Sequence, residues 1–193
     1  HEYKEGVYAT VGLHPIHTSK SFHDEDELGG DESAKGFSSR GEEFNYEAYK
    51  KLAEDPKVVA IGECGLDYFR VTDEEAKRRQ KEVFLKQIEL AKEVKKPLII
   101  HCREAFPDLI DVLKPNTYNL THSIHSTSAQ DGERSRTTSS GLAPSHSALS
   151  SWPKCKVEGL KPSIIHFFTG SKDDAKRLLE MGFSFTFGGV ITF

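Results

Sequence analysis

Three short apolar runs along the chain each lead into a polar side chain that can bind a metal or carry a proton. The runs and the residues that follow them are VVAI at 58–61 with Glu63, LII at 98–100 with His101, and SII at 163–165 with His166. Short runs of this kind are typical of strands that are buried on both faces, as in a parallel α/β sheet. In a (β/α) barrel the functional residues stand at the carboxyl ends of such strands. The pattern therefore predicts an α/β fold of the barrel type, with a site at that edge.

Amphipathic helices are predicted between these strands, and two further strands flank them. A capping box of Thr72 with Glu75 marks the start of the longest helix. The remaining expected elements are strands at 7–11 and 183–187 and helices at 44–53, 105–113 and 171–181. Together these strands and helices make about five βα units of about 30 residues each, whereas a complete barrel takes about 250 residues. We therefore expect a partial (β/α)8 barrel, a single domain over residues 1–193 that lacks strands at both ends.

Two polar segments interrupt the barrel pattern. Residues 17–43 are acidic, with HDEDELGGDES inside them, and predict a long loop on the same face as Glu63. As a lid over the site, this loop would repel a phosphate substrate. Residues 115–162 are rich in Ser and Thr and predict a disordered insertion on the opposite face. That position makes the histidines of the insertion poor candidates for ligands; they are His122, His125 and His146.

Composition narrows the class of protein. With 193 residues, 36% of them hydrophobic and a formal net charge of −4, the chain suits one globular core, and any contact with nucleic acid has to be local. Three cysteines cannot all pair and show no zinc-finger spacing, which favours a reducing compartment, the cytoplasm or the nucleus. No apolar run approaches the roughly 18 residues that a membrane span needs. We expect neither a membrane nor a protein partner.

Glu63, His101 and His166 together have the chemistry of a metal site. One carboxylate and two imidazoles suffice for a single open zinc site, and imidazole also suits manganese. Each residue has a structural alternative as well: Glu63 could cap the turn that follows it, and His166 could be a hydrogen-bonded core residue. The repetition of the pattern at three strand ends favours the metal site.

Two further residues are candidates for substrate binding. His14, in the segment GLHP, could contact substrate or could cap its own turn. Arg103, two residues after His101, could clamp a phosphate through its planar guanidinium or pair with Asp67 or Glu104. For Asp67 itself we expect a structural role in fixing its turn through backbone hydrogen bonds.

Other polar groups near these strand ends favour structural roles. Cys64 and Cys102 are expected to be small buried residues, because the sequence singles out no basic partner that would activate them. The turn at 169–171 (TGS) opens a helix and could hold a phosphate, but helix capping is the expected role.

Four segments of the chain carry a family resemblance. GLHP at 12–15, IGECGLDY at 61–68, ELAKEVKKPLIIHCR at 89–103 and HFFTGS at 166–171 resemble the motifs of the TatD family of metal-dependent hydrolases. The resemblance implies an amidohydrolase-like barrel with two divalent metals, and many members of the family are described as deoxyribonucleases. It also implies that Glu63 bridges the two metals and that His101 and His166 ligate one of them. The HxH motif of the family and its late aspartate have no counterpart here, so one metal subsite is expected to remain.

The resulting functional hypothesis is a deoxyribonuclease that hydrolyses DNA phosphodiester bonds with a metal-activated water. Zn, Mn or Mg are the expected cofactors, and DNA is the expected partner. A divalent metal lowers the pKa of bound water to about 7 and neutralises charge on the phosphate oxygens. One alternative is a related amide or ester hydrolase, because the ligands do not specify the bond. The other is an inactive fragment that acts as an interaction module.

Overall fold

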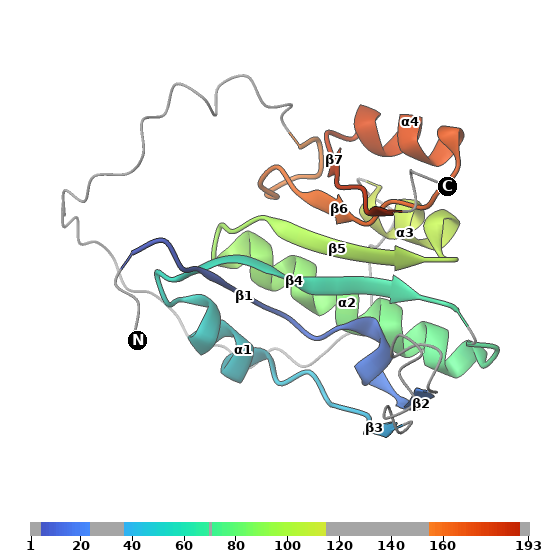
Figure 1. Ribbon diagram of the computed structural model, residues 1–193. Coiled ribbons are helices and arrows are strands. Elements are labelled where there is room, and N and C mark those ends of the chain that lie inside the picture. Colours follow the sequence, from blue (N-terminus) through green and yellow to red (C-terminus); the bar gives the residue numbers. More distant parts are fainter. Residues whose placement is uncertain (1–4, 24–36, 70, 115–154, 190–193) are drawn as a thin grey trace, which may run out of the picture.

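Five parallel strands form the central sheet. The computed structural model describes residues 5–23, 37–69, 71–114 and 155–189. The strand order is β1-β4-β5-β6-β7, and every neighbouring pair is parallel (Figure 1). The bounds are Ala9–Val11 for β1, Val58–Asp67 for β4, Leu98–Arg103 for β5, Ile164–His166 for β6 and Ser184–Phe185 for β7. Because the strands are parallel, their carboxyl ends meet at one edge of the sheet.

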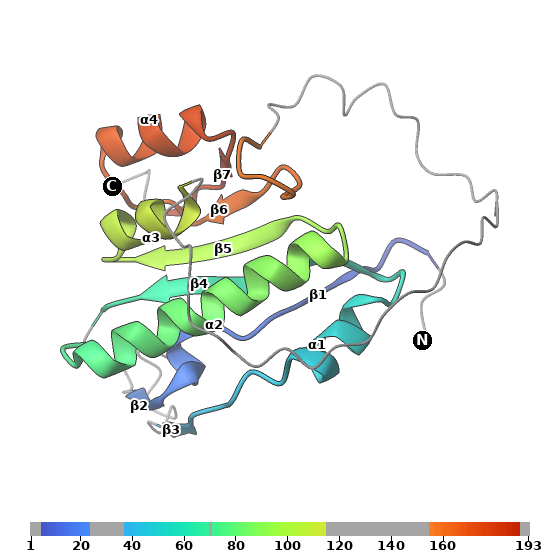
Figure 2. The same ribbon diagram turned by 180° about the vertical axis from the view of Figure 1, so that it is seen from behind.

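Helices connect the strands, as the hydrophobic pattern predicted. They are α1 (Tyr46–Ala53), α2 (Glu74–Glu93), α3 (Phe106–Leu113) and α4 (Lys172–Glu180). Figure 2 shows α2 lying along β4 on the back of the sheet. The predicted cap of α4 is confirmed, since Ser171 and Asp174 form a reciprocal capping box. The predicted cap of α2 was off by one residue: the carboxylate of Asp73, rather than Thr72, accepts hydrogen bonds from the backbone N–H groups of the first turn.

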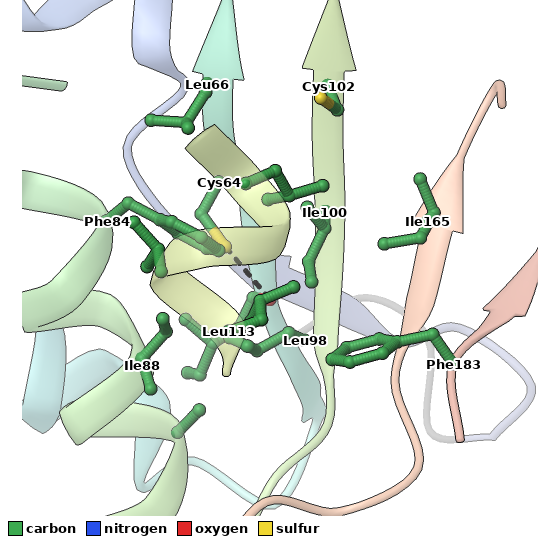
Figure 3. Close-up of a cluster of buried hydrophobic side chains, with 14 of the residues drawn as sticks. Cys64, Leu66, Phe84, Ile88, Leu98, Ile100, Cys102, Leu113, Ile165 and Phe183 are labelled. Carbon is green, nitrogen blue, oxygen red and sulfur yellow. Dashed lines mark hydrogen bonds between the residues drawn. The ribbon is translucent and has the colours of Figure 1, made fainter. Parts of the chain in front are cut away.

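The hydrophobic core lies between the helices and one face of the sheet. Side chains alternate along a strand, and Leu98, Ile100 and Cys102 of β5 all point to this buried face (Figure 3). Phe84 of α2 and Leu113 of α3 pack into the same cluster. Alternation therefore directs the residues between them, His101 among them, to the other face.

That other face is only partly covered by the described residues. Ile99 of β5 and Ile164 of β6, which are paired in register on that face, are half-buried. His101 and His166 occupy paired register positions on β5 and β6, so they are neighbours on this face at its carboxyl end. The sequence-predicted strand ends are thus brought to one edge of the sheet.

Part of each predicted polar segment is described. Residues 20–23 and 37–40, within the predicted loop at 17–43, instead form an antiparallel pair, β2 (Lys20–His23) with β3 (Phe37–Arg40). Residues 24–36 and 115–154 lie outside the described residues. At the end of the predicted insertion, Val157 and Leu160 are buried against the core.

We find no membrane-spanning candidate among the helices that the structure describes, because none combines sufficient length with sufficient apolar character.

Candidate active site

Three polar side chains converge at the carboxyl edge of the sheet. Glu63 Oε1 lies 3.1 Å from Nδ1 of His101 and 3.9 Å from Nε2 of His14. One possible ligand atom from each of the three lies within 4.8 Å of the others, and all three side chains are half-buried. The convergence of Glu63 and His101 agrees with the sequence prediction, but the third member of the group is His14 rather than His166.

His14 is held by the short helix that follows it. It is the N-cap of the 3-10 helix η1 (Pro15–Thr18), and its Nδ1 accepts a hydrogen bond from the backbone N–H of Ile16 at 3.3 Å. Burial and the neighbouring His101 lower the pKa of His14 to about 4, so the ring is neutral at pH 7. A neutral imidazole whose Nδ1 accepts carries its hydrogen on Nε2. The hydrogen of His14 therefore sits on the nitrogen that faces Glu63.

His101 lies between two carboxylates. Its Nδ1 faces Glu63, and its Nε2 lies 2.8 Å from Oδ2 of Asp67, which is buried. Burial would lower the pKa of His101, but the hydrogen bonds to Asp67 and Glu63 outweigh it and raise the pKa to about 9. Without a bound cation, His101 is thus an imidazolium at neutral pH that donates to both carboxylates.

Glu63 is the shared partner of the two imidazoles. Its hydrogen bond with His101 lowers the pKa of the Glu63 carboxyl, and partial burial opposes this shift without reversing it. Glu63 is therefore ionised at neutral pH. An ionised carboxylate flanked by imidazoles is a hard anionic ligand ready for a cation.

His166 lies beside this group but does not join it. It pairs in register with His101, yet its Nδ1 lies 3.3 Å from the Thr186 hydroxyl oxygen, and its ring packs edge-on against Phe167 at 4.6 Å. Among the causes that lower the pKa of the Glu63 carboxyl, the electrostatic interaction with His166 is the smallest. The predicted set of Glu63, His101 and His166 thus shares one edge, with His166 turned toward Thr186.

Arg103 pairs with neither of the two acidic residues that the sequence offered as partners. Its guanidinium lies over the ring of Phe69, 3.4 Å from the ring centroid. Among the described residues, it forms no ion pair with Asp67 or Glu104. The guanidinium is held flat at the exposed carboxyl end of β5, since stacking on an aromatic face leaves its N–H groups at the rim.

Two structural expectations near the site are confirmed. Cys64 and Cys102 are buried, and burial raises the pKa of both thiols, so neither is a ready nucleophile. The turn at 169–171 serves as the cap of α4.

The pair of Glu63 and His101 fits a divalent cation. Four-coordinate zinc with bonds of about 2.0 to 2.2 Å holds neighbouring ligand atoms roughly 3.3 to 3.6 Å apart. The 3.1 Å between Glu63 Oε1 and His101 Nδ1 is close to that separation. A carboxylate on the far nitrogen of a histidine, as Asp67 provides here, is the usual partner of a metal-binding imidazole. His14 is near enough by distance, but Ile16 occupies its lone pair, which suits it to donating a hydrogen bond instead.

The whole chain matches one family of proteins. The sequence model of the TatD-related DNase family matches residues 1–193. The chain belongs to the TatD-related DNase family. The resemblance inferred from the four motifs is thereby confirmed.

TatD relatives extend well beyond the chain. The uncharacterized metal-dependent hydrolase YabD of Bacillus subtilis is 37% identical over 144 residues, which are 75% of this chain and 40% of YabD. The uncharacterized metal-dependent hydrolase YcfH of Escherichia coli is 27% identical over 80% of this chain and 43% of its own length. A 3'-5' ssDNA/RNA exonuclease TatD of Erwinia billingiae is 38% identical over 56% of this chain and 33% of its own length. The chain thus spans less than half the length of these relatives.

Two solved structures, a TatD homolog and an amidohydrolase, share the fold. The crystal structure of the TatD homolog YjjV of E. coli superposes with a TM-score of 0.51 at 21% identity, over 96% of this chain and 48% of YjjV. An uncharacterized amidohydrolase of Saccharomyces cerevisiae gives 0.50 at 21% identity, over 92% of this chain and 47% of that one. The prediction of an α/β fold that corresponds to part of a TatD-type barrel is confirmed.

Sequence reasoning missed the contact between Asp67 and His101. The signal was present, because Glu63 and Asp67 are four residues apart, an even spacing that places both on one face if the strand continues. We expected the strand to stop at Glu63, whereas β4 runs to Asp67. The turn role of Asp67 is confirmed at the same time, since its Oδ1 accepts the Phe69 N–H at 3.0 Å.

Proposed function

We propose that this chain carries a metal-dependent hydrolase site that cleaves DNA phosphodiester bonds. The observation that supports this most is the position of Glu63, whose Oε1 faces imidazoles from two other segments at the carboxyl edge of a parallel sheet. Polar groups gathered at this edge serve chemistry in barrel enzymes. Membership of the TatD-related DNase family agrees with that reading.

Glu63 and His101 are the residues that would hold the cation. His166, on the adjoining strand, is the candidate for a third ligand, once its ring turns away from Thr186. A bound divalent cation would lower the pKa of water and offset charge on phosphate oxygens. Asp67 fixes the orientation of His101 through Nε2, which keeps Nδ1 directed at Glu63.

His14 and Arg103 are the proposed substrate contacts. The Nε2–H of His14 is available to donate to a phosphate oxygen next to Glu63. Arg103, flat on Phe69, presents a planar set of donors that suits a phosphate. Both contacts are local. A chain with a net charge of −4 does not attract nucleic acid by its overall charge, so binding has to depend on local contacts of this kind.

The substrate class is tested with defined oligonucleotides. We expect the full chain to degrade a 5'-labelled single-stranded oligodeoxynucleotide in Mn²⁺, Mg²⁺ or Zn²⁺, and we expect EDTA to stop the reaction. Single strands are the preferred form by analogy with the relative named a 3'-5' ssDNA/RNA exonuclease. The duplex of the same sequence and a panel of carboxylic esters and amides are run in parallel. Hydrolysis of the esters or amides alone would replace DNA with another substrate, and no hydrolysis with any metal would remove the enzyme proposal for this chain.

The affinity for zinc should rise with pH, because a cation and a proton compete for Nδ1 of His101. The pKa of His101 is raised to about 9, so below that value one proton must leave when a cation binds. We expect the zinc association constant to increase about 10-fold per pH unit between pH 6.5 and 8. His14, whose pKa is lowered to about 4, releases no proton in this range. Calorimetric titrations in buffers of different ionisation enthalpy measure the proton release directly, and an affinity that is flat with pH would exclude His101 as the ligand.

A further inference from the structure

Two glutamines of α2 occupy positions that the apolar stripe of the helix would otherwise fill. Gln80 and Gln87 are each 1% exposed and lie among Val83, Phe84 and Ile88 on the buried side of the helix. They are seven residues apart, which is nearly two helical turns, so they share a face. A buried primary amide is costly unless its donor and its acceptor are both satisfied. Both glutamines meet this requirement, and both do so at the active-site edge.

Gln87 binds both backbone groups of Leu13. Its Oε1 accepts the Leu13 N–H at 2.7 Å, and its Nε2 donates to the Leu13 carbonyl at 3.0 Å. Leu13 is buried and directly precedes His14. The pair of bonds therefore fixes the backbone from which His14 projects.

Gln80 does the same at Asp67. Its Oε1 accepts the Asp67 N–H at 2.8 Å, and its Nε2 donates to the Asp67 carbonyl at 2.8 Å. The carboxylate of Asp67 in turn bonds Nε2 of His101 at 2.8 Å. Gln80 thus fixes the residue that orients His101.

We propose that Gln80 and Gln87 are positioning residues, and that α2 is the template that sets the segment of His14 and the segment of Asp67 at a fixed separation. Each amide supplies the donor and acceptor that a neighbouring strand would supply, at points about 10 Å apart along the helix. α2 runs along the back of β4, which allows one rigid element to reach both segments (Figure 2). The catalytic consequence rests on the function proposed above, whereas the positioning itself concerns the metal-free protein.

The first test is made on the metal-free full chain labelled with ¹⁵N at histidine. In the wild type we expect His14 to carry its hydrogen on Nε2, because its Nδ1 accepts from Ile16, and His101 to show one fixed set of ring-nitrogen signals, because both of its nitrogens are held by carboxylates. Gln87→Met keeps a side chain of similar length without the two bonds, and we expect it to turn the His14 signals into an average of both tautomers while His101 is unchanged. Gln80→Met should alter the His101 Nε2 signal and leave that of His14. Ile88→Val, a core change on the same helix, should move neither.

The second test measures zinc affinity and cleavage rate. These two properties distinguish a positioning role from a simple loss of stability. We expect Gln80→Met to weaken zinc binding by about 10-fold to 100-fold, the range seen when the partner of a metal-binding histidine is disturbed. Gln87→Met should lower the rate of oligonucleotide cleavage at saturating substrate at least about 10-fold, with zinc affinity changed less than 2-fold. Selective effects of this kind support the proposal. It is overturned if each variant changes both properties in parallel with its melting temperature, as Ile88→Val would, or if the histidine signals stay at their wild-type positions. A wild type that binds no zinc would refute the proposed function, and the histidine signals would still decide the positioning.

Discussion

Glu63→Gln is expected to lower the affinity for zinc by more than about 100-fold, since disturbing even an indirect partner of a ligand costs 10-fold to 100-fold. The substitution keeps the shape of the side chain and removes the charge that attracts the cation. The amide oxygen can still accept from Nδ1 of His101, 3.1 Å away in the wild type, so the fold should persist. Hydrolysis of the single-stranded oligonucleotide should be lost with the metal.

The control for this variant is Glu82→Gln. Glu82 is a surface residue of α2 that forms an i,i+4 ion pair with Arg78, and such pairs contribute only a few tenths of a kcal/mol. The variant loses the same charge at an exposed position of α2 and should keep wild-type zinc affinity and activity. Zinc binding is measured by competition with a chromophoric chelator, and unfolding in urea verifies that both variants are folded. If Glu63→Gln and Glu82→Gln bind zinc with equal affinity, Glu63 is not a ligand of the metal.

The fold was accessible from sequence because its signals are local. The apolar run at 58–61 and the stripe of α2 each describe one element, and the capping box of Ser171 with Asp174 marks the start of another. Strand ends in a parallel sheet must meet at one edge, so the proximity of Glu63 and His101 followed from topology alone. No knowledge of side-chain rotamers was needed for that step.

The rest of the candidate site depends on long-range geometry. Whether His166 turns to Glu63 or to Thr186 is a choice between rotamers that no spacing encodes. The roles of Gln80 and Gln87 depend on which backbone groups lie opposite α2, 13 and 74 residues away in sequence. A polar residue on an apolar helical face was nevertheless a usable signal, because its burial demands a partner. In the same way, the even spacing of Glu63 and Asp67 could have revealed the two carboxylates around His101.

Gly65→Ala is expected to cause the largest loss of stability among the substitutions considered. Gly65 lies opposite His101 in the pairing of β4 with β5, between Glu63 and Asp67 in sequence. Its φ of +138° is a conformation that other L-residues rarely adopt, and a Cβ there would stand 2.0 Å from the backbone oxygen of His101. The two strands would have to separate, which should reduce the free energy of unfolding by about 4 kcal/mol or more, the range of exceptional substitutions. The same displacement moves His101 from its two carboxylates, so zinc affinity should fall too.

Gly6→Ala separates this steric effect from the intrinsic cost of replacing glycine. Gly6 also has a positive φ, +78°, but a Cβ there would have no neighbour within 4 Å. Only the backbone cost of about 1 to 2 kcal/mol should appear, without any change in zinc affinity. Urea denaturation of both variants measures the difference between them. Equal losses in the free energy of unfolding would mean that the close approach of β4 to β5 at Gly65 does not hold His101 in place. The position of the two carboxylates around the His101 ring would then need another cause.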